Sequence, residues 1–200
     1  MQRYRGVARR VQPVTQKQAM NVLSWLRGQG NARNTLLWAL GISTGLRISD
    51  MLRLRVGDLL DADGEVATSI EVRETKTGKT RLVRLMKVAR DAYMEYCREA
   101  DPAAEDPLFP SRDGGKAITR EQARRLVKKW CAECNLRGDF GTHTLRKTFA
   151  TIAYDSSGHD PVATARLTGH ANPSQLLRYI GRATKTEENI LRGMEAALSG

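Results

Sequence analysis

The chain has 200 residues and 40% of them are hydrophobic, so it can bury a core and suits one domain with short extensions. Its 33 Lys and Arg residues exceed its 22 Asp and Glu residues, and the net charge of +11 favours a polyanionic partner, either nucleic acid or an anionic membrane surface. No apolar run approaches the roughly 20 residues of a membrane span, and the basic N-terminus lacks the apolar stretch of a secretory signal. A cytoplasmic protein that does not span a membrane is therefore expected, and charge alone does not choose between the two partners.

The N-terminal part of the chain is predicted to be a basic arm followed by helices. The arm covers residues 1–14. Thr15 and Gln18 have the spacing of a capping box, which marks the start of a helix. In chain order, helices are expected over residues 15–28, over 34–40 and, after a break at 41–45, over a segment that contains Arg47, Asp50 and Leu54.

The middle of the chain is predicted to form a β-hairpin. Residues 66–73 and 80–85 are expected to be strands, and Gly78 marks the turn between them. Further helices are expected over about residues 88–100, 119–134, 143–154, 161–169, a short segment around Tyr179, and 186–198. Because helices and hairpin strands occur in blocks, the expected fold is α+β, mainly α-helical, with a small antiparallel sheet.

The three Cys residues are an odd, sparse set that fits a reducing compartment better than a disulfide framework. Cys131 and Cys134 form one CxxC, which could be half of a zinc site. No second CxxC or nearby HxxxH completes it, and both positions suit packing at a helix end. Neither a metal nor a cofactor is therefore predicted.

Two pairs of polar residues are spaced to share one face of a helix. Arg47 and Asp50 are three positions apart, so the carboxylate could hold the guanidinium in place; an ordinary surface ion pair is the alternative. His143 and Arg146 have the same spacing at a helix start, where exposed amide groups favour an anion. An HxxR pair alone is a common and weak signal.

Four further residues have ordinary structural explanations when each is taken singly. Lys76 and Lys79 at the hairpin turn could reach into a groove, although lysines at turns are usually just solvated. His170 follows the end of a helix, where a histidine is more often structural. Tyr179 has apolar neighbours, as a half-buried core tyrosine does.

The order of these residues carries more information than any one of them. An Arg in TGLRISD, a Lys in TKTGK, an HxLR pair, an LTGH motif and a Tyr nine residues after its His follow one another. In this order and spacing the chain resembles the catalytic domain of the tyrosine recombinase, or phage integrase, family over about residues 15–198. The residues in question are Arg47, Lys76, His143, Arg146, His170 and Tyr179.

The resemblance implies a role for each matching residue. Arg47 would be the first arginine of the family and Asp50 its supporting acid. Lys76 would be the β-hairpin lysine, with Lys79 as the alternative. The HxLR pair, the next histidine and the nucleophile would be His143, Arg146, His170 and Tyr179.

These residue types also suit cleavage of a phosphodiester on chemical grounds alone. Attack by a tyrosine hydroxyl gathers negative charge on the phosphorus oxygens, which two guanidiniums and His170 can bind. A phenol with a pKa near ~10 needs a base or nearby cations, and His143 is the candidate for its proton. Lys76 can protonate the departing 5′ oxygen. The product is a 3′-phosphotyrosine, and no step requires a metal.

The helix expected from Thr119 carries basic residues at i,i+4 steps with others beside them. Such a stripe could neutralise phosphates of double-stranded DNA, the expected partner, or it could be a solvated face. The basic residues are Arg120, Arg124, Arg125, Lys128 and Lys129.

The expected organisation is a basic arm over residues 1–14, a catalytic domain over 15–185 and a C-terminal helix over 186–200. Since only the arm precedes the first helix, the chain is expected to be an excised catalytic domain or a compact relative without the family's N-terminal clamp. The resemblance implies a nucleoid-associated homo-oligomer of bacterial or phage origin, a tetramer when two duplexes are joined.

The last helix could dock on a neighbouring protomer or fold back on its own core. Its apolar stripe consists of Ile190, Leu191, Met194 and Leu198.

Two alternative functions are compatible with parts of this pattern. Relaxation of DNA by a type IB topoisomerase uses similar chemistry without exchange of partners. A catalytically silent DNA-binding regulator would belong to another class. The short chain and the spacing before Tyr179 favour a recombinase over the first, and the presence of every key residue argues against the second.

Overall fold

Side chains cap the helices where the sequence predicts that they begin. Thr15 Oγ1 accepts a hydrogen bond from the Gln18 amide at 3.2 Å, and Gln18 Oε1 accepts one from the Thr15 amide at 2.8 Å. Thr119 and Gln122 form the same reciprocal pair, at 3.1 and 2.6 Å. Both capping boxes satisfy amide groups that a helix start leaves without a partner, so both predicted starts are confirmed.

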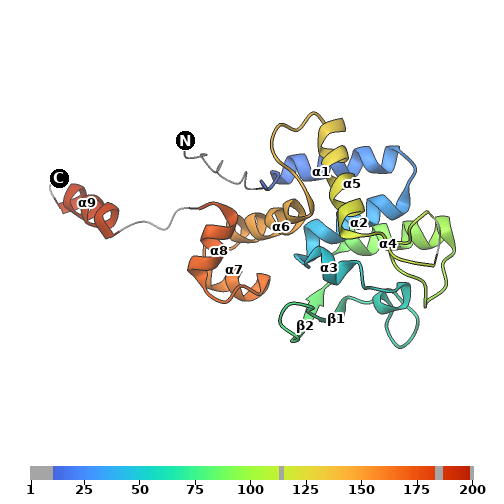
Figure 1. The fold of residues 1–200 in the computed structure, drawn as a ribbon. Helices are drawn as coiled ribbons and strands as arrows, with labels where there is room; N and C mark the ends of the chain where they lie inside the picture. The colour runs from blue at the N-terminus through green and yellow to red at the C-terminus, as the bar shows by residue number, and fades with distance from the viewer. Residues whose placement is uncertain (1–10, 113–114, 183–186, 199–200) are drawn as a thin grey trace, which may run out of the picture. The chain divides into compact units, whose positions relative to one another are not determined.

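The computed structural model describes residues 11–112, 115–182 and 187–198, without the side chains of 187–190. Figure 1 traces the chain, which divides into two compact units, Met1–Ile152 and Ala153–Gly200. The elements are α1 (Gln16–Gly28), α2 (Ala32–Thr44), α3 (Ile48–Met51), a 3-10 turn (Val56–Leu59), β1 (Ser69–Arg73), β2 (Thr80–Arg84), α4 (Lys87–Ala100), α5 (Arg120–Glu133), α6 (Thr142–Ser156), α7 (Pro161–Thr168), α8 (Pro173–Ile180) and α9 (Glu187–Leu198). Mostly helical with one small antiparallel sheet, the architecture confirms the predicted α+β fold.

Helix α2 is the centre of the first unit. It packs against α1 and α4 (Figure 1), and nearly all of its residues are buried. Trp38 is fully buried and donates its indole N–H to the Ala19 carbonyl at 3.0 Å. Its ring packs edge to face against that of Trp130 of α5, with 6.2 Å between the ring centroids. A large aromatic side chain whose one polar atom is satisfied adds strongly to such a core.

Two glycines explain why α2 is longer than expected and why it stops where it does. The sequence suggested a break at residues 41–45, but the helix runs through Gly41 to Thr44. A Cβ on Gly41 would lie 2.6 Å from a Leu145 side-chain carbon, so this glycine permits close packing of helices rather than a break. Gly45 ends the helix at φ +64°, where a Cβ would lie 2.2 Å from the Phe149 ring.

The β-hairpin is shorter than predicted but lies where it was expected. Strands β1 and β2 pair antiparallel, with Ile70 opposite Val83 and Val72 opposite Arg81. Side chains alternate across the sheet, so Ile70, Val72 and Val83 are buried. The same alternation carries Glu74, just beyond β1, to the buried side.

The described end of the expected N-terminal arm is part of the first unit. The Gln12 amide donates to the Asp139 carbonyl at 2.9 Å, and the Val14 amide donates to Thr148 Oγ1 at 3.0 Å. Val14 is only 2% exposed. Residues 11–14 therefore pack against the first unit and do not form a separate arm. The apolar side chain of Val14 is buried in the core. Residues 1–10 lie outside the described range.

Caps also define the helices of the second unit. Asp160 accepts from the amides of Val162 and Ala163 at the start of α7, and Asn172 accepts from Gln175 at the start of α8. Pro occupies the first turn of both, where its missing N–H costs nothing. In α9 the expected stripe is exposed at Leu191, Met194 and Leu198, whereas the Ile190 side chain is not among those described.

Among the described residues, no helix combines the length and apolar character needed to cross a bilayer.

Candidate active site

The candidate residues fall into two sets, one in each unit. Arginines, the hairpin lysines and the first histidine belong to the first unit. The second histidine and the tyrosine belong to the second. The first set is Arg47, Asp50, Lys76, Lys79, His143 and Arg146, and the second is His170 and Tyr179.

Arg146 is a buried arginine on α6, only 5% exposed. Its Nη1 donates a hydrogen bond to the Gly45 carbonyl at 2.5 Å. Gly45 ends α2 and precedes the segment that carries Arg47, so the two arginines are brought together by this one contact. The spacing of α2 and α6 that permits the contact depends on the absence of a side chain at Gly45.

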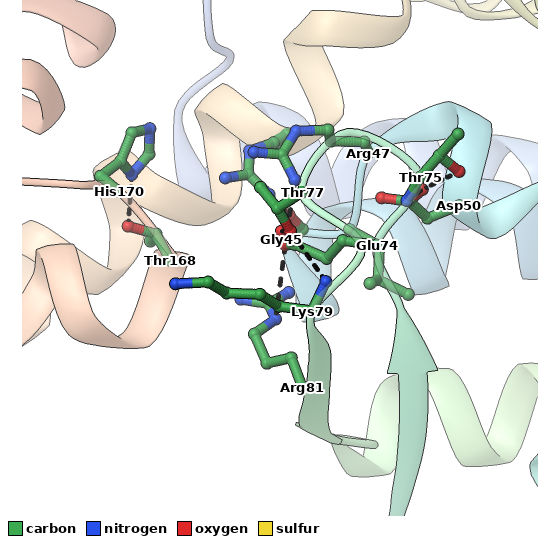
Figure 2. Close-up of polar contacts among 12 residues, drawn as sticks. Gly45, Arg47, Asp50, Glu74, Thr75, Thr77, Lys79, Arg81, Thr168 and His170 are labelled. Carbon is green, nitrogen blue, oxygen red and sulfur yellow. Dashed lines mark hydrogen bonds and ion pairs between the residues drawn. The ribbon is translucent and has the colours of Figure 1, made fainter.

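Arg47 lies just before α3, in extended conformation, and forms an ion pair with Glu74 (Figure 2). Its Nη1 is 2.9 Å from Glu74 Oε1, and 23% of the Arg47 side chain is exposed. The prediction that Asp50 holds Arg47 is wrong. Helix α3 has four residues and starts after Arg47, so residues 47 and 50 do not occupy stacked positions of one helix.

Asp50 instead anchors the hairpin turn. It is 2% exposed, and its Oδ1 accepts hydrogen bonds from the Thr75 amide at 2.9 Å and from the Thr75 hydroxyl at 2.7 Å (Figure 2). A buried carboxylate that accepts two hydrogen bonds holds its donors firmly. Asp50 therefore supports the site through the residue next to Lys76.

Glu74 holds the other side of the same turn. Its Oε2 accepts a hydrogen bond from the Thr77 hydroxyl at 2.9 Å, and its amide donates to the Lys79 carbonyl at 2.9 Å. Lys76, exposed, thus lies between two threonines that are each held by a buried carboxylate. Lys79 is exposed as well, and its amide donates to Thr77 Oγ1 at 3.3 Å.

Glu74 is a site residue that the sequence analysis missed. Burial opposes its ionisation, but the hydrogen bond from Thr77 and the contacts with Arg47 outweigh this, so the pKa of Glu74 lies below its ordinary value. Arg81 of β2 lies 4.0 Å from the same carboxylate, and burial lowers the pKa of Arg81. The signal was present in the strand alternation, because Glu74 follows buried Ile70 and Val72 at steps of two.

His143 begins α6 in a cationic environment. The residue is exposed, but partial desolvation lowers the pKa of His143 below its ordinary value, and neighbouring cations lower it further. A neutral imidazole can accept a proton at neutral pH. The cations are Arg120, Lys147, Arg146 and Arg47.

The second set brings His170 and Tyr179 together. Their ring centroids are 5.0 Å apart with an angle of 46° between the planes. The Thr168 hydroxyl lies 2.6 Å from His170 Nδ1, which fixes the orientation of the imidazole (Figure 2). Tyr179 is half-buried on α8, its hydroxyl oxygen has almost no exposed surface, and its ring lies beside that of His170.

The basic stripe is confirmed as an exposed face of α5. The opposite face buries Ala123, Val127 and Trp130, which leaves the basic residues on the outside. Glu121 forms a 3.0 Å ion pair with Arg124, which partly offsets the charge of the stripe at that point. The exposed basic residues are Arg120, Arg124, Arg125, Lys128 and Lys129.

The cysteines behave as packing residues. Cys131 is fully buried in the core, and burial raises the pKa of its thiol to about 12. Over the ranges that the structure describes, no group of three His, Cys, Asp or Glu side chains is arranged to hold a metal ion. The first unit contains two arginines and a lysine-bearing turn, a set of cationic groups that suits a phosphate.

Comparison with known proteins agrees with this chemistry. Residues 12–186 match the model of the family described as "Phage integrase family". A probable integrase/recombinase, YoeC of Bacillus subtilis (strain 168), is 34% identical over 171 residues, which cover 86% of this chain and 90% of YoeC. Tyrosine recombinase XerC of Xylella fastidiosa (strain M23) is 31% identical over 140 residues, or 70% of this chain and 45% of XerC.

The fold matches a solved recombinase as well. The XerH site-specific recombinase bound to difH substrate in a pre-cleavage complex superposes with a TM-score of 0.71 at 22% identity. The match covers 94% of this chain and 55% of that one. This chain thus spans about half the length of XerH and less than half that of XerC.

Proposed function

Because this chain belongs to the phage integrase family, we propose that it is a site-specific recombinase that cuts and rejoins double-stranded DNA through a 3′-phosphotyrosine. The observation that carries the proposal is that Arg146 donates a hydrogen bond to the carbonyl of Gly45, two residues before Arg47, so both arginines lie at the end of α2. Two guanidiniums that meet at one phosphodiester can bind its two non-bridging oxygens. Fixed donors of this kind give the largest single contribution to many enzymatic rates.

Tyr179 supplies the nucleophile in this proposal. Its oxygen attacks the phosphorus atom while the phenolic proton passes to His143, which is neutral at neutral pH because its pKa is lowered. His170, held by Thr168 and adjacent to Tyr179, donates a hydrogen bond to the same phosphate. The proposal requires that both sets of residues act on one phosphate when DNA is bound.

Lys76 completes the cleavage step. The bond between phosphorus and the 5′ oxygen breaks as the new bond to Tyr179 forms, and the departing oxygen takes a proton from the ammonium group. The turn that carries Lys76 is fixed through its two neighbours, Thr75 and Thr77, and Lys79 on the same turn is the alternative donor. A 5′ hydroxyl from another strand then reverses the step and joins new partners.

DNA holding and assembly belong to other surfaces of the chain. The exposed basic face of α5 is positioned to neutralise backbone phosphates. We assign residues 15–185, with residues 11–14 packed against them, to the catalytic domain, and residues 1–10 and 186–200 to its extensions. The exposed apolar side chains of α9 support docking on a neighbouring protomer within a tetramer on DNA. The site of action would be the nucleoid.

The test is a suicide substrate, a nicked duplex from which the short cleaved fragment diffuses away. The wild-type chain should become covalently attached to the DNA and migrate as an adduct in denaturing electrophoresis. Mixing two duplexes should also yield branched junctions. Absence of any adduct would overturn the proposal, and relaxation of supercoils without junctions would indicate a topoisomerase instead.

The role of α9 has its own test. Removing residues 186–200 should reduce multimeric complexes in a gel shift while binding of a single protomer to DNA persists. A chain with Leu191, Met194 and Leu198 changed to Ser provides a matched variant of full length. Unchanged multimer formation by both variants would contradict the assignment.

A further inference from the structure

Glu74 joins three parts of the proposed active site that are distant in sequence. Its Oε1 lies 2.9 Å from Arg47 and 4.0 Å from Arg81 Nε, whereas its Oε2 accepts the hydroxyl hydrogen of Thr77. Glu74 as a whole is 6% exposed. Removing one partner from a buried ion pair leaves the other charge uncompensated, so these contacts constrain each member strongly.

The ion pair between Glu74 and Arg47 is formed at one nitrogen of the guanidinium, Nη1. Arg47 Nη1 has almost no exposed surface, yet the side chain as a whole is 23% exposed. The exposed fraction therefore belongs to other atoms of the side chain. Because the guanidinium is rigid and planar, an ion pair at one nitrogen restrains where its other donors lie.

The contact with Thr77 acts on the hairpin turn. Thr77 follows Lys76, and Thr75 before it is held by Asp50. The turn is closed further by the Gly78 amide, which donates to the Glu74 carbonyl at 2.9 Å. One side chain thus fixes both the orientation of Arg47 and the path of the backbone that carries Lys76.

We propose that Glu74 is a positioning residue for strand cleavage, one that sets Arg47 and the Lys76 turn in a common geometry before DNA binds. This inference rests on the proposed function, in which Arg47 binds the phosphate and Lys76 protonates the leaving oxygen. Glu74 itself does not contact the DNA in this role. Its effect is on the rate of cleavage at saturation rather than on affinity.

The experiment measures single-turnover adduct formation on the suicide substrate, and DNA affinity separately. Glu74→Gln should slow cleavage by roughly 10- to 100-fold at saturating protein, the scale of a misplacement of about 1 Å, with affinity changed less than about 3-fold. Glu74→Asp, which keeps the charge, should recover part of the rate. Glu71→Gln, at an exposed position of β1, removes the same charge from the same hairpin and should leave the rate within about 2-fold.

A second variant guards against loss of folding. Thr77→Val removes one hydrogen bond to the carboxylate and keeps the ion pair, so it should fold and slow cleavage by about 3- to 10-fold. Glu74→Gln or, if that variant does not fold, Thr77→Val cleaving at the wild-type rate would overturn the inference. So would equal losses for Glu71→Gln and Glu74→Gln. Failure of the wild-type chain to form an adduct would refute the proposed function instead.

Discussion

The two units hold their candidate residues in different ways. In the first, Arg146 is tied to the end of α2, Arg47 to the hairpin, and the hairpin to Asp50, so each contact links separate elements. In the second, His170 lies between two short helices, α7 and α8, and its ring contacts that of Tyr179 on α8. In the proposed mechanism the phosphate-binding groups therefore belong to a large core and the nucleophile to a small unit. Substitutions in the two units should separate loss of the nucleophile from loss of phosphate and DNA contacts.

The largest effect is expected from Tyr179→Phe. Loss of the hydroxyl removes the nucleophile, so covalent adduct should fall below detection. DNA affinity should stay within about 2-fold, because the basic face and the arginines belong to the first unit. Adduct yield and gel-shift affinity measure the two effects. Tyr154→Phe in the same unit is the control, and adduct formed by Tyr179→Phe would break the comparison.

The next effect belongs to the phosphate-binding arginines. Arg146→Lys keeps the charge but loses the planar fork, and it should slow cleavage by roughly 10²- to 10³-fold, as loss of one fixed donor does. Single-turnover rates at saturating protein provide the measurement. Arg137→Lys, at an exposed position of the same unit, should have no effect. A rate unchanged by Arg146→Lys would show that the first unit does not bind the reacting phosphate.

Lys76→Ala tests the proton donor. Cleavage should slow by roughly 10²-fold, the scale of general acid catalysis. A substrate in which sulfur replaces the 5′ bridging oxygen should restore the rate, since a thiolate leaves without a proton. Lys79→Ala is the matched control on the same turn. If only Lys79→Ala were slow and rescued by sulfur, the two lysines would exchange roles.

A smaller effect is expected from the basic face of α5. Lys128→Ala should weaken DNA binding by a few-fold and lower the slope of log affinity against log salt by about 1. Arg124→Ala should do less, because Glu121 already offsets its charge. Titrations at several salt concentrations distinguish the two. Equal salt slopes for both variants and the wild type would indicate that this face is a solvated surface that does not contact DNA phosphates.

The smallest effect concerns pH. The folded chain holds the pKa of His143 below its ordinary value, so it resists protonation that the unfolded chain accepts near pH ~6.5. Above that pH both states are neutral and the difference vanishes; as pH falls through it, folding stability declines. Thermal unfolding is measured at pH 7.5, 6.5 and 5.5, about one-unit steps around this value. The unfolding temperature should fall less with decreasing pH for His143→Gln than for the wild-type chain. An equal decline for both chains would contradict the shift.

What the sequence could predict follows from the range of each interaction. Capping boxes at Thr15 and Thr119 join neighbours in sequence, so the pattern located them. The full length of α2 depends on packing of Gly41 against Leu145, which no local pattern contains. The order of the motifs predicted Arg47 and Arg146 as site residues. The hydrogen bond from Arg146 to the Gly45 carbonyl joins residues 101 positions apart, so only the tertiary structure shows it.

The supporting acid shows the same limit more sharply. Helical spacing favoured Asp50 as the partner of Arg47, on the assumption that α3 begins earlier than it does. The hairpin, which is remote in sequence, supplies Glu74 instead. Strand alternation indicated that Glu74 faces inward, yet only the tertiary structure identifies what it meets.

The most direct test of the central claim is to identify the residue that carries the DNA. Adduct trapped on the suicide substrate can be digested with protease and nuclease, and the modified peptide sequenced by mass spectrometry. The account predicts a 3′-linked nucleotide on the Tyr179 oxygen, with a free 5′ hydroxyl on the released strand. Attachment to any other residue, or a 5′-linked nucleotide, would contradict it.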